Sequence, residues 1–195
     1  MTDNLFEHPP HATPLGHDEL ANLRVPIVNR AQLNTLEANN VALGRRWAQR
    51  SRKACFQTDF LTELHTRMFG EVWTWAGQYR LNDVNIGNTA PHQIEVAVHQ
   101  VFDDARAWIE YKSFEPAEIA IRLHHRLVLI HPFVNGNGRS TRLMADVAAK
   151  SLGLKPFTWG ADSLAETGEA RAAYVAALKA ADNHDLDPLL AFAQS

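Results

Sequence analysis

The chain has one cysteine, Cys55, in 195 residues, and no long run of apolar residues. A single thiol cannot form an internal disulfide, and rare cysteine is typical of a reducing compartment. No apolar stretch approaches the roughly 20 residues that a membrane-spanning helix needs. The first residues lack the basic start and apolar core of a secretion signal. The formal net charge of −3 gives no indication of direct binding to nucleic acid or membranes. We therefore expect a cytoplasmic protein.

The composition, 46% hydrophobic and 21% charged, is that of an ordinary globular protein with one core. Residues 1–28 are rich in proline and predict an N-terminal arm that wraps the body of the protein. Residues 29–195 predict a single domain.

Apolar residues recur mostly at helical spacing. This periodicity, with proline and glycine as boundary signals, predicts helices over residues 29–50, 58–69, 93–111, 116–130, 140–150, 166–181 and 187–192. A helix capped by Thr58 should end near Gly70. Val84 and Ile86 alternate with polar residues, so residues 82–88 predict a short β-hairpin. The fold class is all-α, a helical bundle carrying one small β element.

The stretch from His131 to Arg142, HPFVNGNGRSTR, carries most of the chemistry. A glycine-containing turn that opens a helix presents unpaired N–H groups and the positive end of the helix dipole. Arg139 and Arg142 are three residues apart and leave the same side of that helix. Guanidinium groups match phosphate oxygens well. The pattern predicts a polyphosphate site with His131 at its edge.

The chain has ten histidines, and most need no chemical role. His124 and His125 lie without a carboxylate at ligand spacing and without a His-Glu-x-x-His pattern, so packed or solvated imidazoles are expected there. His131 differs because it borders the anion turn. An imidazole titrates near neutral pH and is suited to accept a proton from an alcohol.

The twelve residues from His131 to Arg142 resemble the signature H-x-F-x-[D/E]-G-N-G-R-x-x-R of the Fic/Doc (Fido) family, with Asn135 at the acidic position. Other segments are also similar, and from about residue 30 onward the chain resembles the Fic subgroup called mobile mystery protein B. These segments are 75–80 (WAGQYR), 85–87 (NIG), the His124-His125 pair and 177–182. The resemblance implies a Fic-type helical bundle with a small β-hairpin flap.

The resemblance also implies an activity and a role for each motif residue. A protein adenylyltransferase moves AMP from ATP to a Ser, Thr or Tyr hydroxyl of a target protein. His131 would be the general base. The α- and β-phosphates would be held by Gly136, Asn137 and Gly138, the β-phosphate also by Arg139, and the γ-phosphate by Arg142.

The flap and the metal position are the next implications. Asn85, Ile86 and Gly87 would pair main chain to main chain with the target, although a plain connector between helices is the alternative. Asn135 stands where an acid normally holds Mg²⁺; its amide offers an oxygen without charge. Slower transfer, Mg²⁺ held mainly by phosphates and water, or a different transferred group are the three outcomes we consider.

Fic proteins are often restrained by a glutamate that pairs with the second motif arginine. Glu37, followed by Asn39, is the nearest candidate, although Leu33 replaces the usual hydroxyl residue. The alternative is that Glu37 is a solvated surface residue, and restraint would then come from a small antitoxin-like partner.

Two other functions stay open at this point. One is a low-turnover nucleotide-binding regulator, or a toxin-like partner of an antitoxin. The neutral Asn135 at the acidic position is the residue that indicates it. The other is a Fic enzyme with another phosphate-linked donor, or one that phosphorylates its target as the Doc branch does. That branch has a lysine where Gly138 and Arg139 keep the Gly-Arg pair.

Overall fold

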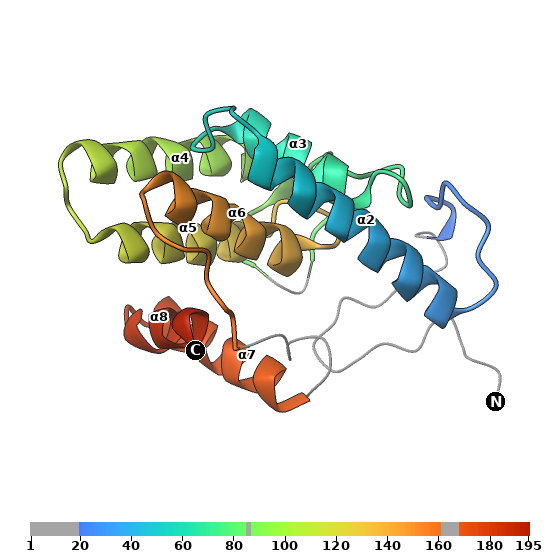
Figure 1. The fold of residues 1–195 in the computed structure, drawn as a ribbon. Helices are drawn as coiled ribbons and strands as arrows, with labels where there is room; N and C mark the ends of the chain where they lie inside the picture. The colour runs from blue at the N-terminus through green and yellow to red at the C-terminus, as the bar shows by residue number, and fades with distance from the viewer. Residues whose placement is uncertain (1–19, 85–86, 161–167) are drawn as a thin grey trace.

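The computed structural model of the protein describes residues 20–84, 87–160 and 168–195, and the secondary structure of these residues is helical apart from two isolated bridges (Figure 1). The helices are α2 (Arg30–Arg50), α3 (Thr58–Phe69), η1 (Pro91–Gln93), α4 (Ile94–Glu110), α5 (Pro116–Ile130), α6 (Asn137–Ser151), α7 (Gly168–Asp182) and α8 (Asp187–Gln194). The predicted all-α class is confirmed. None of these helices is both long and apolar enough to cross a membrane.

Helices α2 to α6 form the main bundle, in which α2 packs on α3, α4 on α5, and α5 on α6 (Figure 1). The apolar stripes predicted from the sequence face inward. Fully buried side chains come from every layer: Leu33, Phe60, Leu64, Ile94, Leu123, Phe133 and Met144. The core thereby fixes the C-terminal end of α5 and the N-terminal end of α6, which residues 131–136 connect.

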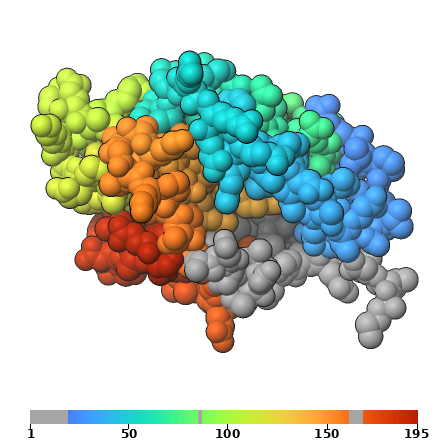
Figure 2. Space-filling model, in the orientation of Figure 1, coloured from blue at the N-terminus to red at the C-terminus, as the bar shows by residue number. Residues whose placement is uncertain are grey.

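Helices α7 and α8 form a hairpin with its own apolar cluster. Tyr174 and Leu189 of this hairpin pack with Trp159 against Ile121 of α5 and Ala145 of α6. Figure 2 shows this C-terminal segment (red) lying directly against the segment around α6 (orange). The hairpin therefore packs on α5 through α8 and reaches Ala145 of α6 through the shared apolar cluster.

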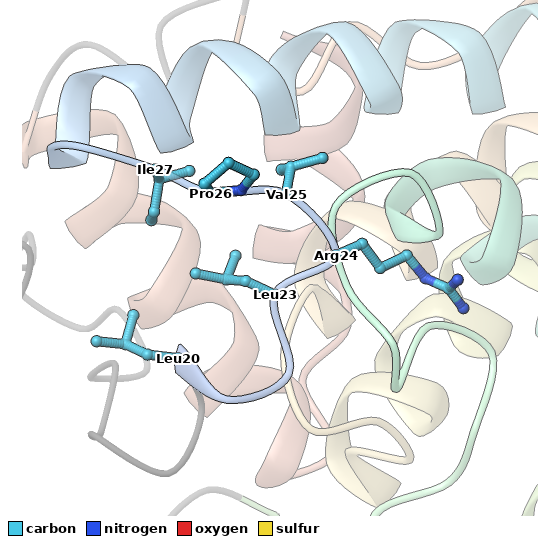
Figure 3. Close-up of a pocket in the computed structure, with 6 residues that line it drawn as sticks. All are labelled: Leu20, Leu23, Arg24, Val25, Pro26 and Ile27. Atoms are coloured by element: carbon cyan, nitrogen blue, oxygen red, sulfur yellow. The ribbon is translucent and has the colours of Figure 1, made fainter.

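The segment 20–28 lies along the chain that follows α3. Leu23 forms an isolated antiparallel bridge with Trp73, and the Arg24 N–H donates to the Val72 carbonyl at 2.8 Å. Leu20 and residues 23–27 line a surface hollow of about 340 Å³ (Figure 3). The arm predicted over residues 1–28 falls mostly outside the described residues, and the domain division stays a prediction.

The start of α6 and the predicted cap of α3 differ from prediction. Helix α6 begins at Asn137, three residues before the predicted start, so the motif turn is the first turn of the helix. Helix α3 begins at Thr58 itself and follows Gln57, which makes no side-chain cap hydrogen bond. The Thr58 hydroxyl lies instead 3.3 Å from His99 Nδ1.

The predicted β-hairpin over residues 82–88 is wrong for the residues that can be described, 82–84 and 87–88, which form no strand. Tyr79, before this segment, and Asn88, within it, pair instead with the end of α5 and the residues after it. Tyr79 forms a bridge with Phe133, and the Asn88 N–H donates to the Leu129 carbonyl at 3.2 Å. Backbone groups satisfied in this way have no need of a partner strand. Asn85 and Ile86 lie outside the described residues.

Candidate functional site

His131 ends α5 in a left-handed conformation, with φ 51°. This region is uncommon for a residue with a side chain and is often found at functional sites. The ring is buried, and its Nδ1 has no hydrogen-bond partner among the described residues. Burial, together with the nearby Arg80 charge, lowers the pKa of His131 to about 4, against a smaller opposing effect of the Val128 carbonyl. The imidazole is therefore neutral at pH 7 and able to accept a proton.

The turn after His131 is closed by the side chain of Asn137. Its Oδ1 accepts from the Phe133 N–H at 2.9 Å, and its Nδ2 donates to the Phe133 carbonyl at 2.8 Å. Gly136 precedes the helix with φ 76°, and a Cβ there would come within 2.5 Å of the Phe69 ring. Only glycine fits this position. Because the Asn137 amide is engaged, its main-chain N–H is the group left to face a ligand.

The start of α6 has the geometry of an anion site. The first helical hydrogen bond here runs from the Ser140 N–H to the Gly136 carbonyl at 2.9 Å. The N–H groups of residues 137–139 have no carbonyl one turn earlier in the helix, and they lie at the positive end of its dipole. Phosphate oxygens are the ligands that such an arrangement favours.

The two motif arginines have different surroundings. Arg139 lies over the Phe69 ring, 4.7 Å from its centroid, and its Nη1 is 2.6 Å from Glu37 Oε2. Arg142 lies over the Tyr174 ring at 5.2 Å. The expectation that Glu37 pairs with the second motif arginine is therefore wrong, since its partner is the first. Helix α2 crosses the start of α6, and this crossing brings Glu37 to Arg139.

Glu37 is held from both sides. Its Oε1 accepts from Trp73 Nε1 at 2.8 Å, while Oε2 meets Arg139, and the side chain is 13% exposed. A carboxylate that is fixed by an indole donor and a guanidinium occupies the space beside Arg139 in a defined orientation. A phosphate group approaching Arg139 would compete with it.

His65 is a site residue that the sequence did not reveal. Its Nδ1 accepts from the Gly77 N–H at 2.9 Å, so Nε2 carries the proton and donates to the Asn135 carbonyl at 3.0 Å. The ring stacks on Phe133 with centroids 3.7 Å apart. Burial lowers the pKa of His65 to about 3. A signal existed: His65 is a polar residue within the buried stripe of α3.

His124 and His125 have different surroundings. His124 is buried, and its Nε2 lies 3.0 Å from the Tyr174 hydroxyl. His125 pairs with Asp182. In residues 20–84, 87–160 and 168–195, no three His, Cys, Asp or Glu side chains gather as a metal site would need.

Asn135, the residue predicted as a metal ligand, has its side-chain oxygen in one hydrogen bond. Asn135 Oδ1 accepts from the Gly136 N–H at 2.6 Å, which leaves a second lone pair.

Asp146, on the following turns of α6, accepts from Trp159 Nε1 at 2.9 Å and from the Phe157 N–H at 3.2 Å. Burial raises the pKa of Asp146 to about 6. No sequence pattern indicated a role for this carboxyl.

Comparisons with known proteins agree with this geometry. Residues 55–149 match the Fic/DOC family. The chain is 32% identical over 138 residues to protein adenylyltransferase fic-1 of Caenorhabditis elegans, which covers 69% of this chain and 26% of that protein. The chain thus spans about a quarter of the length of that curated relative.

Solved structures show the same fold. A Caenorhabditis elegans Fic-1 fragment (residues 134–508 of that protein) has a TM-score of 0.61 and 25% identity, covering 82% of this chain and 48% of the other. The BepC protein of Bartonella tribocorum, solved with bound AMPPNP, has a TM-score of 0.69 at 16% identity, covering 99% and 96% of the two chains. The predicted Fic-type bundle is confirmed.

Proposed function

The chain belongs to the Fic/DOC family, and from this premise we propose that it is a protein adenylyltransferase that moves AMP from ATP to a Ser, Thr or Tyr hydroxyl of a target protein. The observation that carries the proposal is the position of a neutral, buried His131 next to the N-terminal turn of α6. The name of the fic-1 relative gives the same activity.

The proposed reaction is a single displacement at the α-phosphorus of ATP. The acceptor hydroxyl oxygen attacks the α-phosphorus as its proton passes to the His131 ring. The bond between the α-phosphorus and the oxygen bridging to the β-phosphorus breaks, and pyrophosphate leaves. Neutral His131 suits the first event, because a protonated ring has no lone pair to accept a proton.

The phosphate chain would lie along the start of α6. The main chain from Gly136 to Gly138 and the N–H of Asn137 would hold the α- and β-phosphates, Arg139 the β-phosphate and Arg142 the γ-phosphate. Fixed donors aimed at developing negative charge lower the barrier without reorganising during the reaction. Mg²⁺, when bound, would neutralise part of the phosphate charge, and the free lone pair of Asn135 Oδ1 fits such a hard cation.

Restraint by Glu37 is part of the proposal. The carboxylate lies on Arg139, the arginine assigned to the β-phosphate, with a distance of 2.6 Å. ATP would have to displace it to use that guanidinium. The resting chain is therefore expected to transfer slowly, and a small antitoxin-like regulator is a further, separate source of restraint.

A restrained chain with a neutral Asn135 also favours a second function, a nucleotide-binding regulator with low turnover. The target docking role of Asn85, Ile86 and Gly87 and the cytoplasmic location complete the proposal. A protein hydroxyl is the proposed partner in the first function, and nucleotide alone in the second.

Labelled ATP separates these functions. The chain is incubated with cell extract and with ATP labelled at the α- or the γ-phosphate. AMP transfer leaves only α-label on protein, phosphorylation leaves only γ-label, and a regulator leaves neither. His131→Ala should reduce α-label transfer by roughly 10²-fold or more with nucleotide affinity nearly unchanged, because the ring acts on the hydroxyl. An equal loss of nucleotide binding would assign His131 to the structure of the loop.

A further inference from the structure

We propose that Arg80 is a positioning residue for the transfer reaction: one buried guanidinium fixes the His131 main chain and both roots of the 82–89 loop. The inference rests on the proposed function, because it concerns how the base and the acceptor are aligned. Arg80 follows the turn after α3 and touches neither the phosphate-binding turn nor the arginines assigned to it.

The guanidinium donates to four main-chain carbonyls. Nε donates to His131 O at 2.8 Å, and Nη2 donates to Ile130 O at 3.3 Å. Nη1 donates to Asn82 O at 2.9 Å, and Nη2 also reaches Thr89 O at 2.5 Å. The side chain therefore joins the end of α5 to two points that are seven residues apart in the loop.

Arg80 is 3% exposed, and among the described residues Asp83 is the carboxylate whose charge acts on it, raising the Arg80 pKa against the larger lowering by burial. A buried charge is costly unless it is well hydrogen-bonded. Here the partial negative charge of carbonyls at the C-terminal end of α5 stabilises the cation, as a helix dipole does. The five N–H donors of arginine in one plane suit this set of acceptors, whereas a lysine ammonium has three donors around one atom.

The bonds act where the backbone most needs support. His131 has φ 51°, a conformation that costs free energy in a residue with a side chain. Arg80 holds the carbonyls on both sides of the His131 N–Cα–C unit, those of Ile130 and His131. The direction in which the imidazole leaves the chain follows from that conformation.

The same loop is attached to this turn by main-chain bonds. The Arg80 N–H donates to Pro132 O at 2.9 Å, and the Asn88 N–H donates to Leu129 O at 3.2 Å. Asn82 and Thr89 are thereby set relative to His131 through the Arg80 side chain together with these main-chain bonds. Misplacement of reacting groups by about 1 Å can reduce rates on the order of 10²-fold.

Two substitutions test the proposal by separating charge from shape. Arg80→Lys keeps the charge and loses the planar set of donors, and Arg80→Gln loses both. The matched control is Arg106→Ala, which also removes an arginine that donates to a carbonyl, that of Phe56, away from the site. Each variant is assayed for transfer of α-label to protein, for ATP affinity and for thermal unfolding.

Both Arg80 variants are expected to keep ATP affinity within about 2-fold of the parent chain and to lose transfer by roughly 10-fold or more, in kcat rather than in KM for ATP. Arg106→Ala should retain transfer. Equal losses of transfer and ATP affinity in Arg80→Lys, or unchanged transfer in Arg80→Gln, would overturn the proposal. If Arg80→Gln unfolds, the Lys variant decides.

A readout without catalysis separates this inference from the proposed function. NMR titration of the His131 imidazole should show a higher pKa in Arg80→Gln than in Arg80→Lys, because the Arg80 charge lowers that pKa. Among the described residues, Arg80 is the charged group that shifts the pKa of His131. Hydrogen exchange at the Asn88 N–H should be faster in both variants. If the parent chain labels no protein, the proposed function fails, and unchanged NMR readouts would then overturn the Arg80 role as well.

Discussion

Glu37 and Arg139, 102 positions apart in the chain, form an ion pair with 2.6 Å between Oε2 and Nη1. The pair joins α2 to the first turn of α6, where the phosphate site is proposed. Arg139 cannot keep this geometry and also face a β-phosphate with the same Nη1. Binding of ATP and the resting ion pair are therefore expected to exclude one another.

The first prediction follows from this pair. Glu37→Gln should raise transfer or self-modification, because the amide removes the charge that holds Arg139 while its oxygen can still accept from Trp73 Nε1. Label transfer from α-labelled ATP measures the effect. Glu63→Gln, which removes a glutamate paired with Lys53 and Arg67 and not with a motif arginine, serves as control. Glu37→Gly should give the same increase as the Gln variant. Unchanged transfer with the fold intact would instead leave Glu37 as a structural residue.

The second prediction concerns Arg142. Arg142→Ala should weaken ATP binding more than AMP binding, because AMP lacks the γ-phosphate proposed to meet this guanidinium. Loss of a charge-assisted contact costs on the order of 1.5–3 kcal/mol. Calorimetry with both nucleotides checks the difference. Identical losses for ATP and AMP would remove the γ-phosphate assignment.

Tyr174 provides the control for that experiment. Arg142 lies over its ring, and its hydroxyl is 3.0 Å from His124 Nε2. Tyr174→Phe keeps the ring under the guanidinium and removes the hydroxyl. We expect little change in the preference for ATP over AMP in this variant. A preference lost equally in Tyr174→Phe would mean that the α7 contact, not the charge, sets it.

The third prediction is a pH dependence of stability. Burial lowers the pKa of His65 and His124 to about 3 and of His131 to about 4, all below the unfolded value of 6.5. Between about pH 6 and 4 the unfolded chain binds protons that these folded imidazoles do not. Stability therefore falls as pH is lowered, by about 1.4 kcal/mol per pH unit for each such proton.

Asp146 opposes this trend, since its folded pKa is raised to about 6 from 3.8 and the folded chain binds its proton first. Asp146→Asn should therefore make the loss of stability between pH 6 and 4 steeper, and His65→Gln should make it shallower. Urea unfolding at several pH values gives both slopes. Parallel slopes in all three chains would show that these groups do not control the acid response.

The sequence predicted the parts of the fold that depend on local pattern. The proline at the first turn and the apolar spacing of Ile119, Leu123 and Leu127 placed α5 at its observed bounds. The turn from Gly136 to Gly138 likewise indicated a helix N-terminus. These signals lie within one helix turn of the structure that they specify.

Features that need two distant segments were not predicted. The partner of Glu37 depends on how α2 crosses α6, because Arg139 and Arg142 are only three positions apart on that helix. The hairpin prediction failed because Tyr79 and Asn88 found partners at Phe133 and Leu129. His65 looked like one polar residue in an apolar stripe until the fold brought Gly77 and Asn135 to its two nitrogens.

The last prediction concerns Asn135, the residue that departs from the family signature. Asn135→Asp adds a negative oxygen with almost no change of shape, at a side chain that can keep its contact with the Gly136 N–H. Hard divalent cations gain from carboxylate ligands, so metal and nucleotide binding should become more strongly coupled. We expect faster AMP transfer at low Mg²⁺, with the difference shrinking as Mg²⁺ is raised. The measurement is initial transfer rate over a Mg²⁺ series at fixed ATP. A variant that is slower at every Mg²⁺ level would show that Asn135 is suited to other chemistry, and AMP transfer would then give way to an alternative phosphate-linked donor.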